Sequence, residues 1–277
     1  MKKGTALHEL LYLPDHWAKM RTVSTETMRV SRHAYGAHFR QYLLCAKPLQ
    51  TPSKLPRHAV VFFHGGAWRF GTPEQFVAYA SFFTNLGYTV FMPSYRRLPF
   101  YRFTHLHEDL TATLLEISRL LGNEDAGHSK LIVGGMSAGG HMAAALSHDA
   151  SVWEAAGFLE NPCAAFFACG APLDLNMLPD SPLLLRLAGR RGSDSYQKAN
   201  PFWHLQQCAE VLPALCIHGT QDGLVPVACA ESFVQLAQQK SKASLHLIEG
   251  GTHLDAGRWA YQEDEPQLLI KAWLEQR

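Results

Sequence analysis

Residues 130–148 read KLIVGGMSAGGHMAAALSH, and this stretch decides the fold. The apolar run KLIVGGM predicts a buried strand, and the small residues of AGGHMAAALSH predict a helix directly after it. Between the two lies a Gly-x-Ser-x-Gly pattern formed by Gly135, Ser137 and Gly139. In a strand–turn–helix setting this pattern holds a serine in a strained backbone conformation with its hydroxyl exposed. Ser137 is therefore a predicted nucleophile, and the alternative is a glycine-rich helix start with a capping serine.

The same alternation of strand and helix runs through most of the chain. Further strands are predicted at 58–63, 88–95, 163–170, 213–219 and 243–249, and further helices at 74–87, 105–122, 226–240 and 265–276. An antiparallel hairpin over 22–30 and 38–44 comes before them. This order predicts an α/β fold: a mostly parallel central sheet, with the hairpin at one edge and helices on both faces.

One segment, residues 171–208, breaks this rhythm. It contains several prolines and the short apolar patch LLLRLAG, and it is too long for a plain connection. It follows a strand, on the side where open α/β sheets bind ligands. We interpret it as a small cap over the site, within a single domain that spans residues 1–277, rather than as a second domain. A plain surface excursion is the alternative.

Two loops supply an acid and a base for the serine. Asp222 lies in HGTQDGLVP, residues 218–226, and His253 lies in EGGTHLD, residues 249–255; each segment follows a predicted strand. A serine hydroxyl needs a base to take its proton, and the base needs an acid to fix its tautomer. We therefore predict Ser137, Asp222 and His253 as a catalytic triad.

Glu249 and Asp255 are rival acids for the same role. Both lie too near His253 in sequence to arrive from a separate strand. With Asp222 as the acid, the chain order is serine, acid, histidine, which is the order found in α/β-hydrolases.

The motif HGGAW, residues 64–68, ends the strand predicted at 58–63. Glycines in that loop let backbone N–H groups turn toward the oxyanion that forms when a serine attacks a carbonyl. Gly65 permits the turn, and the predicted donors are the N–H groups of Gly66, Ala67 and Ala138. His64 is expected to brace the loop, and Trp68 either lines the substrate pocket or packs beneath the loop.

Together these motifs resemble the α/β-hydrolase superfamily, in the branch of hormone-sensitive-lipase-like esterases and arylformamidases of the kynurenine formamidase type. The resemblance covers residues 22–277 and rests on HGGAW, SYRRLP, GMSAGG, HGTQD and GGTH in that order. Two positions depart from the family pattern. Ala67 replaces the third glycine of HGGG, and Phe100 stands where a Tyr-Arg-Leu-Ala-Pro-Glu motif has glutamate, which leaves the support of the oxyanion loop open.

Composition excludes several other classes of protein. The net charge of the 277 residues is +1, so no electrostatic feature favours nucleic acid. No apolar run approaches the roughly 18 residues of a membrane span. Two lysines follow Met1 as in a signal peptide, but His8, Glu9, Asp15 and His16 interrupt the apolar stretch that should come next. A cytoplasmic protein is expected.

Cysteines and histidines give no case for a disulfide framework or a metal. The six cysteines form no CxxC pair and are expected to be free thiols in a reducing compartment. His105 and His107, followed by Glu108 and Asp109, resemble metal ligands, but a spacing of two puts the histidines on different helix faces. Neither a metal nor a cofactor is expected.

The predicted activity is hydrolysis of carboxylic esters with small or medium acyl or aryl groups, through an acyl-enzyme on Ser137. Within enzymes the alternative is an arylformamidase acting on N-formylkynurenine, because an ester and a formamide need the same catalytic groups. A non-catalytic binding protein on this fold is the alternative of a different class. The expected partner is a small-molecule substrate, and the oligomeric state stays open.

Overall fold

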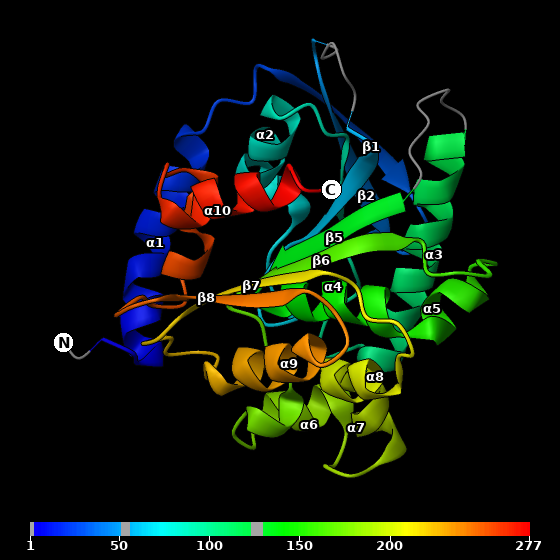
Figure 1. Ribbon diagram of the computed structural model, residues 1–277, viewed down its shortest axis with the longest axis vertical. Helices are drawn as coiled ribbons and strands as arrows, with labels where there is room; N and C mark the ends of the chain where they lie inside the picture. The colour runs from blue at the N-terminus through cyan, green and yellow to red at the C-terminus, as the bar shows by residue number, and fades with distance from the viewer. Residues whose placement is uncertain (1–2, 51–55, 123–129) are drawn as a thin grey trace.

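The computed structural model describes residues 3–50, 56–122 and 130–277, and these form an eight-stranded sheet (Figure 1). The strand order across the sheet is β1-β2-β4-β3-β5-β6-β7-β8. The strands are β1 (Met28–Ala34), β2 (Tyr42–Pro48), β3 (His58–Phe63), β4 (Val90–Pro93), β5 (Lys130–Met136), β6 (Cys163–Cys169), β7 (Ala214–Gly219) and β8 (Ala243–Ile248). β2 runs antiparallel to both of its neighbours, β1 and β4. The six strands β3 to β8 all run parallel to one another. The predicted mostly parallel sheet with an antiparallel edge is confirmed.

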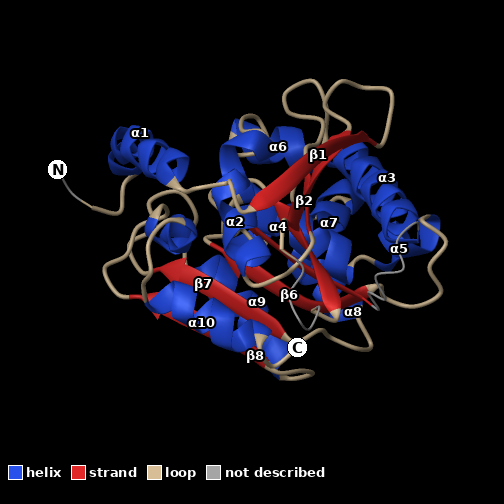
Figure 2. Ribbon diagram, turned by 90° about the horizontal axis from the view of Figure 1, so that it is seen from above, coloured by secondary structure: helices blue, strands red, loops and turns tan. Residues whose placement is uncertain are grey.

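Both faces of the sheet are buried, as the sequence of β3 illustrates. Val61 and Phe63 face one hydrophobic core, whereas Val60 and Phe62 face the other, and none of the four is more than 1% exposed. A run of apolar residues without polar alternation is typical of a parallel strand covered on both sides. Seen from above, β1 and β7 point in different directions, which is the usual twist of such a sheet (Figure 2).

Helices divide between the two cores. One core takes side chains from α3 (Phe103–Gly122), α4 (Ala138–His148), α5 (Ala150–Ala155) and α9 (Ala228–Gln238). The other takes side chains from α1 (Ala6–Thr22), α2 (Val77–Asn85) and α10 (Glu265–Leu274), together with the short turns η1 (Pro73–Phe76) and η3 (Asp255–Ala260). The sheet therefore lies between two helical layers, as predicted.

The segment predicted as a cap folds into short helices. These are η2 (Leu175–Met177), α6 (Pro182–Ala188), α7 (Asp194–Ala199) and α8 (Pro201–Gln207), and they gather beside α9 (Figure 1). The side chains of Ser181, Ser193 and Asn200 each accept a backbone N–H at the start of one of the three α-helices. Side-chain caps of this kind satisfy the free N–H groups of helices too short to be stable alone.

The N-terminal part of the chain differs from the prediction. The hairpin strand predicted from residue 22 begins only at Met28, because Thr22 is the last residue of helix α1. Helix α1 was not predicted at all, since its buried side is polar and includes His8, Glu9 and His16. All six cysteines lie in the described residues and are free, as expected. Within the described ranges, no helix is both long and apolar enough to cross a bilayer.

Candidate active site

Ser137 occupies a sharp turn between β5 and α4. Its φ is 55° and its ψ is −126°, a backbone conformation that residues with a side chain seldom adopt. The turn is tight because glycines flank it: a Cβ on Gly139 would collide with the carbonyl oxygens of Phe63 and His64, and one on Gly135 would lie 2.5 Å from the Gly139 carbonyl carbon. Close packing of β3, β5 and α4 thus explains why this position requires the Gly-x-Ser-x-Gly pattern.

The end of β6 brings the serine turn to the predicted base. The Ser137 N–H donates to the carbonyl of Cys169, at 2.8 Å. The next residue, Gly170, has a φ of +55°, and a Cβ there would lie 3.2 Å from Nδ1 of His253 and 3.4 Å from Oδ2 of Asp222. Within the described part of the chain, the half-buried Ser137 hydroxyl makes no hydrogen bond. The hydrogen bond between a catalytic serine and its base often forms or tightens only when substrate binds.

Asp222 and His253 form a buried pair at the ends of β7 and β8. Nδ1 of His253 lies 2.7 Å from Oδ2 of Asp222, and the two side chains are 4% and 0% exposed. The other oxygen, Oδ1, accepts the N–H groups of Leu224 and Val225, each at 2.8 Å. A carboxylate that only accepts fixes the proton of the imidazole on Nδ1 and leaves Nε2 free to take a proton.

Asp222 and His253 each stabilise the charged form of the other, whereas burial would favour the neutral forms. Burial alone would raise the pKa of Asp222, but His253 and the hydrogen bonds from His218 and His253 hold it well below its usual range. Burial would lower the pKa of His253, and the Asp222 carboxylate more than reverses this, so that the pKa lies above 6.5. The arrangement stabilises an imidazolium, the species that a general base becomes when it accepts a proton.

A second histidine, His218, also contacts the acid. Its Nε2 lies 3.2 Å from Oδ2 of Asp222 and 3.0 Å from the carbonyl oxygen of Val225, and the side chain is fully buried. A carbonyl oxygen can only accept, so Nε2 carries the proton and donates to both. The sequence motifs do not predict this contact, because His218 lies within strand β7. Its spacing of four from Asp222 is the only signal for it.

The HGGAW loop lies against the serine turn. A Cβ on Gly65 would be 3.1 Å from the Met136 carbonyl oxygen and 3.4 Å from Cβ of Ser137. Gly66, Ala67 and Trp68 all have positive φ, at 125°, 51° and 56°. Successive residues in such conformations turn their N–H groups to the inside of a loop, which is a recurring way to bind an anion. The predicted donors at 66, 67 and 138 thus belong to two segments in contact.

His64 and the segment after β4 hold this loop in place. The His64 ring donates from Nδ1 to the Gly65 carbonyl at 2.7 Å and stacks on Tyr95 with ring centroids 4.5 Å apart. Burial lowers the pKa of His64 to about 3, so the ring is neutral. Tyr95 donates its hydroxyl to the His64 carbonyl, and the Leu98 N–H donates to the Trp68 carbonyl. These contacts support the loop without the glutamate that Phe100 replaces.

Trp68 is buried beneath the loop, with 5% of its surface exposed. Its Nε1–H donates to Nδ1 of His141 at 3.2 Å, and Nε2 of His141 donates to the Ala199 carbonyl at 2.7 Å. Because His141 is part of α4 and Ala199 ends α7, this chain of hydrogen bonds links the HGGAW loop, the helix that follows Ser137 and the segment predicted as a cap. Of the two readings of Trp68, the geometry supports the one in which the side chain packs beneath the loop.

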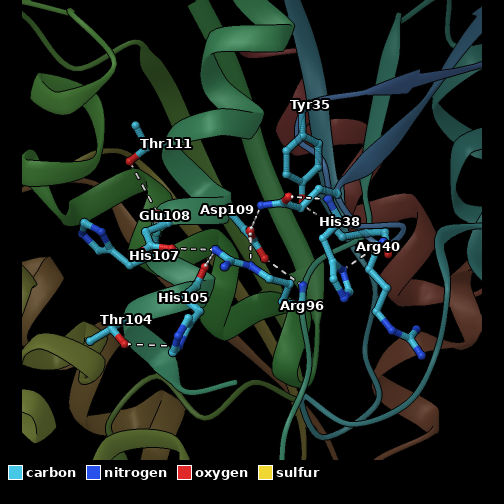
Figure 3. A network of polar contacts seen from close by, with 12 residues as sticks. Tyr35, His38, Arg40, Arg96, Thr104, His105, His107, Glu108, Asp109 and Thr111 are labelled. Carbon is cyan, nitrogen blue, oxygen red and sulfur yellow. Dashed lines mark hydrogen bonds and ion pairs between the residues drawn. The ribbon is translucent and has the colours of Figure 1, made fainter. Parts of the chain in front are cut away.

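The cluster of His105, His107, Glu108 and Asp109 is occupied by ion pairs (Figure 3). Asp109 accepts from the Arg96 side chain at 2.9 Å and from the Arg96 backbone at 2.7 Å, while Glu108 takes another nitrogen of the same guanidinium at 2.8 Å. His107 turns away to the carboxylate of Asp149, at 3.0 Å. In the described ranges no group of three or more histidine, cysteine or acidic side chains could hold a metal. The cluster instead anchors the segment that supports the oxyanion loop.

The two arginines of the cap have different surroundings. Arg191 donates to Asp180 at 2.6 Å, to the Tyr196 hydroxyl at 2.9 Å and to backbone carbonyls of η2, so it holds the cap together. Arg190 is exposed, and both arginines line a cavity of about 450 Å³ together with Leu184 and Leu185. Of the two guanidinium groups, Arg190 is therefore the one available to a ligand.

Sequence comparisons connect this chain with esterases. A family model for the α/β-hydrolase fold matches residues 60–168, which contain the HGGAW loop and Ser137. Two curated proteins of Oryza sativa subsp. japonica, both named as probable isoprenylcysteine alpha-carbonyl methylesterases, are 28% identical over 219 residues and 24% identical over 220 residues. The alignments cover 71% and 73% of this chain, which spans about half the length of these relatives (50% and 53%).

Structural comparisons extend the similarity over nearly the whole chain. An inhibited esterase B from Lactobacillus rhamnosis has a TM-score of 0.76 at 17% identity, over 97% of this chain and 94% of the other. Esterase 2 of Thermogutta terrifontis, phosphonylated by sarin, has a TM-score of 0.71 at 21% identity, over 91% of this chain and 93% of the other. At these identities the likeness establishes the fold.

Proposed function

Since this chain has the α/β-hydrolase fold, we propose that it is a serine esterase, which cleaves carboxylic esters through an acyl-enzyme on Ser137. The observation that carries the proposal is the buried Asp222–His253 pair, with a bond of 2.7 Å, together with a serine on a positive-φ turn whose N–H donates to Cys169, the neighbour of the Gly170 that lies against that pair. The names of the rice relatives support an ester as the bond cleaved.

In the proposed mechanism, Nε2 of His253 takes the Ser137 proton as the hydroxyl oxygen attacks the ester carbonyl. The N–H groups of Gly66, Ala67 and Ala138 stabilise the oxyanion, and each such donor contributes about 10²- to 10³-fold in rate. His253 then gives its proton to the leaving alcohol, and an acyl-enzyme remains. Water, activated by the same nitrogen, attacks the acyl-enzyme and restores Ser137.

The proposed substrates carry small or medium acyl or aryl groups. This size class rests on the resemblance of the motifs to compact esterases; the residues that line the cavity of the cap, among them Leu184 and Leu185, include none of the proposed triad. A formamide would use the same groups, so its hydrolysis is tested as a separate outcome.

The experiment pairs labelling with turnover. Wild-type protein should react with a fluorophosphonate probe and hydrolyse p-nitrophenyl acetate and butyrate, whereas Ser137→Ala should do neither and should keep its circular dichroism spectrum. Ser147→Ala is a matched control ten residues further along the same helix, where the Ser147 hydroxyl donates to the Ala143 carbonyl at 2.7 Å. Ester hydrolysis by Ser137→Ala at the wild-type rate would refute the proposal. A higher kcat/KM for N-formylkynurenine than for every ester would assign the site to a formamidase.

A further inference from the structure

Helix α1 closes over the two loops that carry Asp222 and His253. At its start, the backbone of Thr5 lies so near Gly223 that a Cβ on the glycine would be 2.5 Å from the Thr5 carbonyl carbon. Toward its other end, Nδ1 of His16 lies 3.0 Å from the Tyr261 hydroxyl, beyond η3. The helix is thus held at both ends by elements around the histidine loop, although it lies about 240 residues away in the sequence.

Glu9 is the residue of α1 that enters this region. It is 2% exposed, and its Oε1 accepts the N–H of His253 at 2.8 Å and the N–H of Gly223 at 3.3 Å. Its Oε2 lies 3.4 Å from the N–H of Leu254. One carboxylate oxygen therefore links the backbone of the base to the residue that directly follows the acid.

The contacts of the Glu9 side chain match its ionised form. All three partners are N–H donors, so both oxygens act as acceptors, and that is the pattern of a carboxylate. Hydrogen bonds to an ionised acceptor are shorter and stronger than neutral ones. A buried charge with three donors is stabilised in place, and it holds those donors in turn.

We propose that Glu9 is a positioning residue of the active site, which sets the distance between the acid loop and the histidine loop and places a second negative charge beside His253. The role rests on the proposed function, since it concerns the base of that reaction. Glu9 lies outside residues 60–168, the part of the chain that the α/β-hydrolase family model matches.

The charge of Glu9 predicts an effect on pH dependence. Burial lowers the pKa of His253, while Asp222 and, to a smaller extent, Glu9 raise it. The other ionisable groups facing this region are His218 from β7, His16 from α1 and Asp255 from η3; burial lowers the pKa of His16 to about 4, and Nε2 of His218 donates to Asp222 and to the Val225 carbonyl. All three groups are present both in wild type and in Glu9→Gln, so they do not distinguish the two proteins.

The experiment is to replace Glu9 by glutamine and to follow His253 in two ways. The amide is of nearly the same size but has no charge, so the pKa of His253 should fall by roughly 0.5 to 1 unit. Because the base works only when unprotonated, the acid limb of kcat/KM should move to lower pH by the same amount. The value of kcat on the plateau should fall about tenfold, because the amide oxygen can take the place of Oε1 but the amide nitrogen then faces the N–H of Leu254, a second donor.

The second readout is independent of activity. NMR titration of the imidazole of His253, assigned by its loss in His253→Gln, gives its pKa directly in wild type and in Glu9→Gln. Failure of the proposed function would appear as wild-type protein without esterase activity, whereas failure of the role of Glu9 would appear as an unchanged His253 pKa in Glu9→Gln. The two failures are thus distinguishable.

Glu249→Gln is the matched control. It removes the same charge from an exposed position at the start of the histidine loop, where the Glu249 carboxylate accepts from the Thr220 hydroxyl at 3.4 Å. It should leave the pKa of His253 and the acid limb where they are in wild type. A Glu9→Gln protein that matches this control in pKa and in kcat would overturn the proposal.

Glu9→Asp is the second variant, and it tests the proposal if Glu9→Gln does not fold. The aspartate keeps the charge but is one methylene shorter, so it cannot reach both loops. The acid limb should therefore stay within about 0.3 units of wild type while kcat falls about tenfold. A folded Glu9→Asp with wild-type kcat would overturn the positioning role.

Discussion

Asp222→Asn is the sharpest test of the acid–base pair, because the Asp222 carboxylate accepts on both of its oxygens. Oδ1 takes the N–H groups of Leu224 and Val225, each at 2.8 Å, and Oδ2 takes Nδ1 of His253 at 2.7 Å. An asparagine keeps its carbonyl oxygen on the two backbone donors and turns its amide N–H toward the histidine. Nδ1 must then accept, the proton moves to Nε2, and His253 can no longer take the proton of Ser137.

We expect kcat to fall by about 10⁴-fold in this variant, equivalent to about 5.5 kcal/mol of activation free energy. The assay is hydrolysis of p-nitrophenyl butyrate, with circular dichroism as the check on folding. Asp255→Asn is the control, because Asp255 holds the same loop through the Thr252 N–H at 2.8 Å and forms no bond with the His253 ring. We expect it to retain more than about one-tenth of kcat. Retention of that much by Asp222→Asn, or equal losses in both variants, would refute the assignment of the acid.

Three further predictions follow from the geometry. Because Asp222 raises the pKa of His253 and only the unprotonated ring is a base, kcat/KM should fall as the pH drops through a midpoint above the ordinary pKa of a histidine; a midpoint below that ordinary value would contradict this. Gly139→Ala should lower stability by about 2 kcal/mol in thermal melts, since its Cβ meets two backbone oxygens, whereas Gly122→Ala, where the space is open, should not. Leu184 is 4% exposed and Leu185 is 56% exposed. Leu184→Ser should therefore destabilise the protein, whereas Leu185→Ser should shift the ratio of kcat/KM values between long and short esters. Identical effects of the two substitutions would show that the cap does not select the substrate.

The sequence was sufficient for the sheet because its signals are local. The continuous apolar run of β3 and the turn glycines after β5 each specify a strand or a turn within a few residues, and the predicted bounds of β3 and β5 match the structure. The three residues of the predicted triad follow β5, β7 and β8, and since these strands are parallel their ends meet at one edge of the sheet. The spatial placement of Asp222 beside His253 follows from topology alone.

The sequence was not sufficient for groups whose role depends on distant partners. Helix α1 shows a weak apolar pattern because the side that it buries carries His8, Glu9 and His16, and polar residues on a buried side hide the helical period. The same residues that argued against a signal peptide are the ones that dock this helix. The partners of Glu9 lie more than 200 residues away, and no local pattern encodes such a contact.

The surroundings of His253 also explain how a fully enclosed base could work. Burial removes the water that would otherwise stabilise an imidazolium, and this is the largest influence on its pKa. Asp222 opposes that loss directly through Nδ1, and Glu9 opposes it through the backbone N–H of the same residue. Both carboxylates are held by N–H donors before any proton moves, so little reorganisation is needed when the charge appears. On this reasoning the buried Glu9 of α1 would help the proposed base to carry a positive charge away from water.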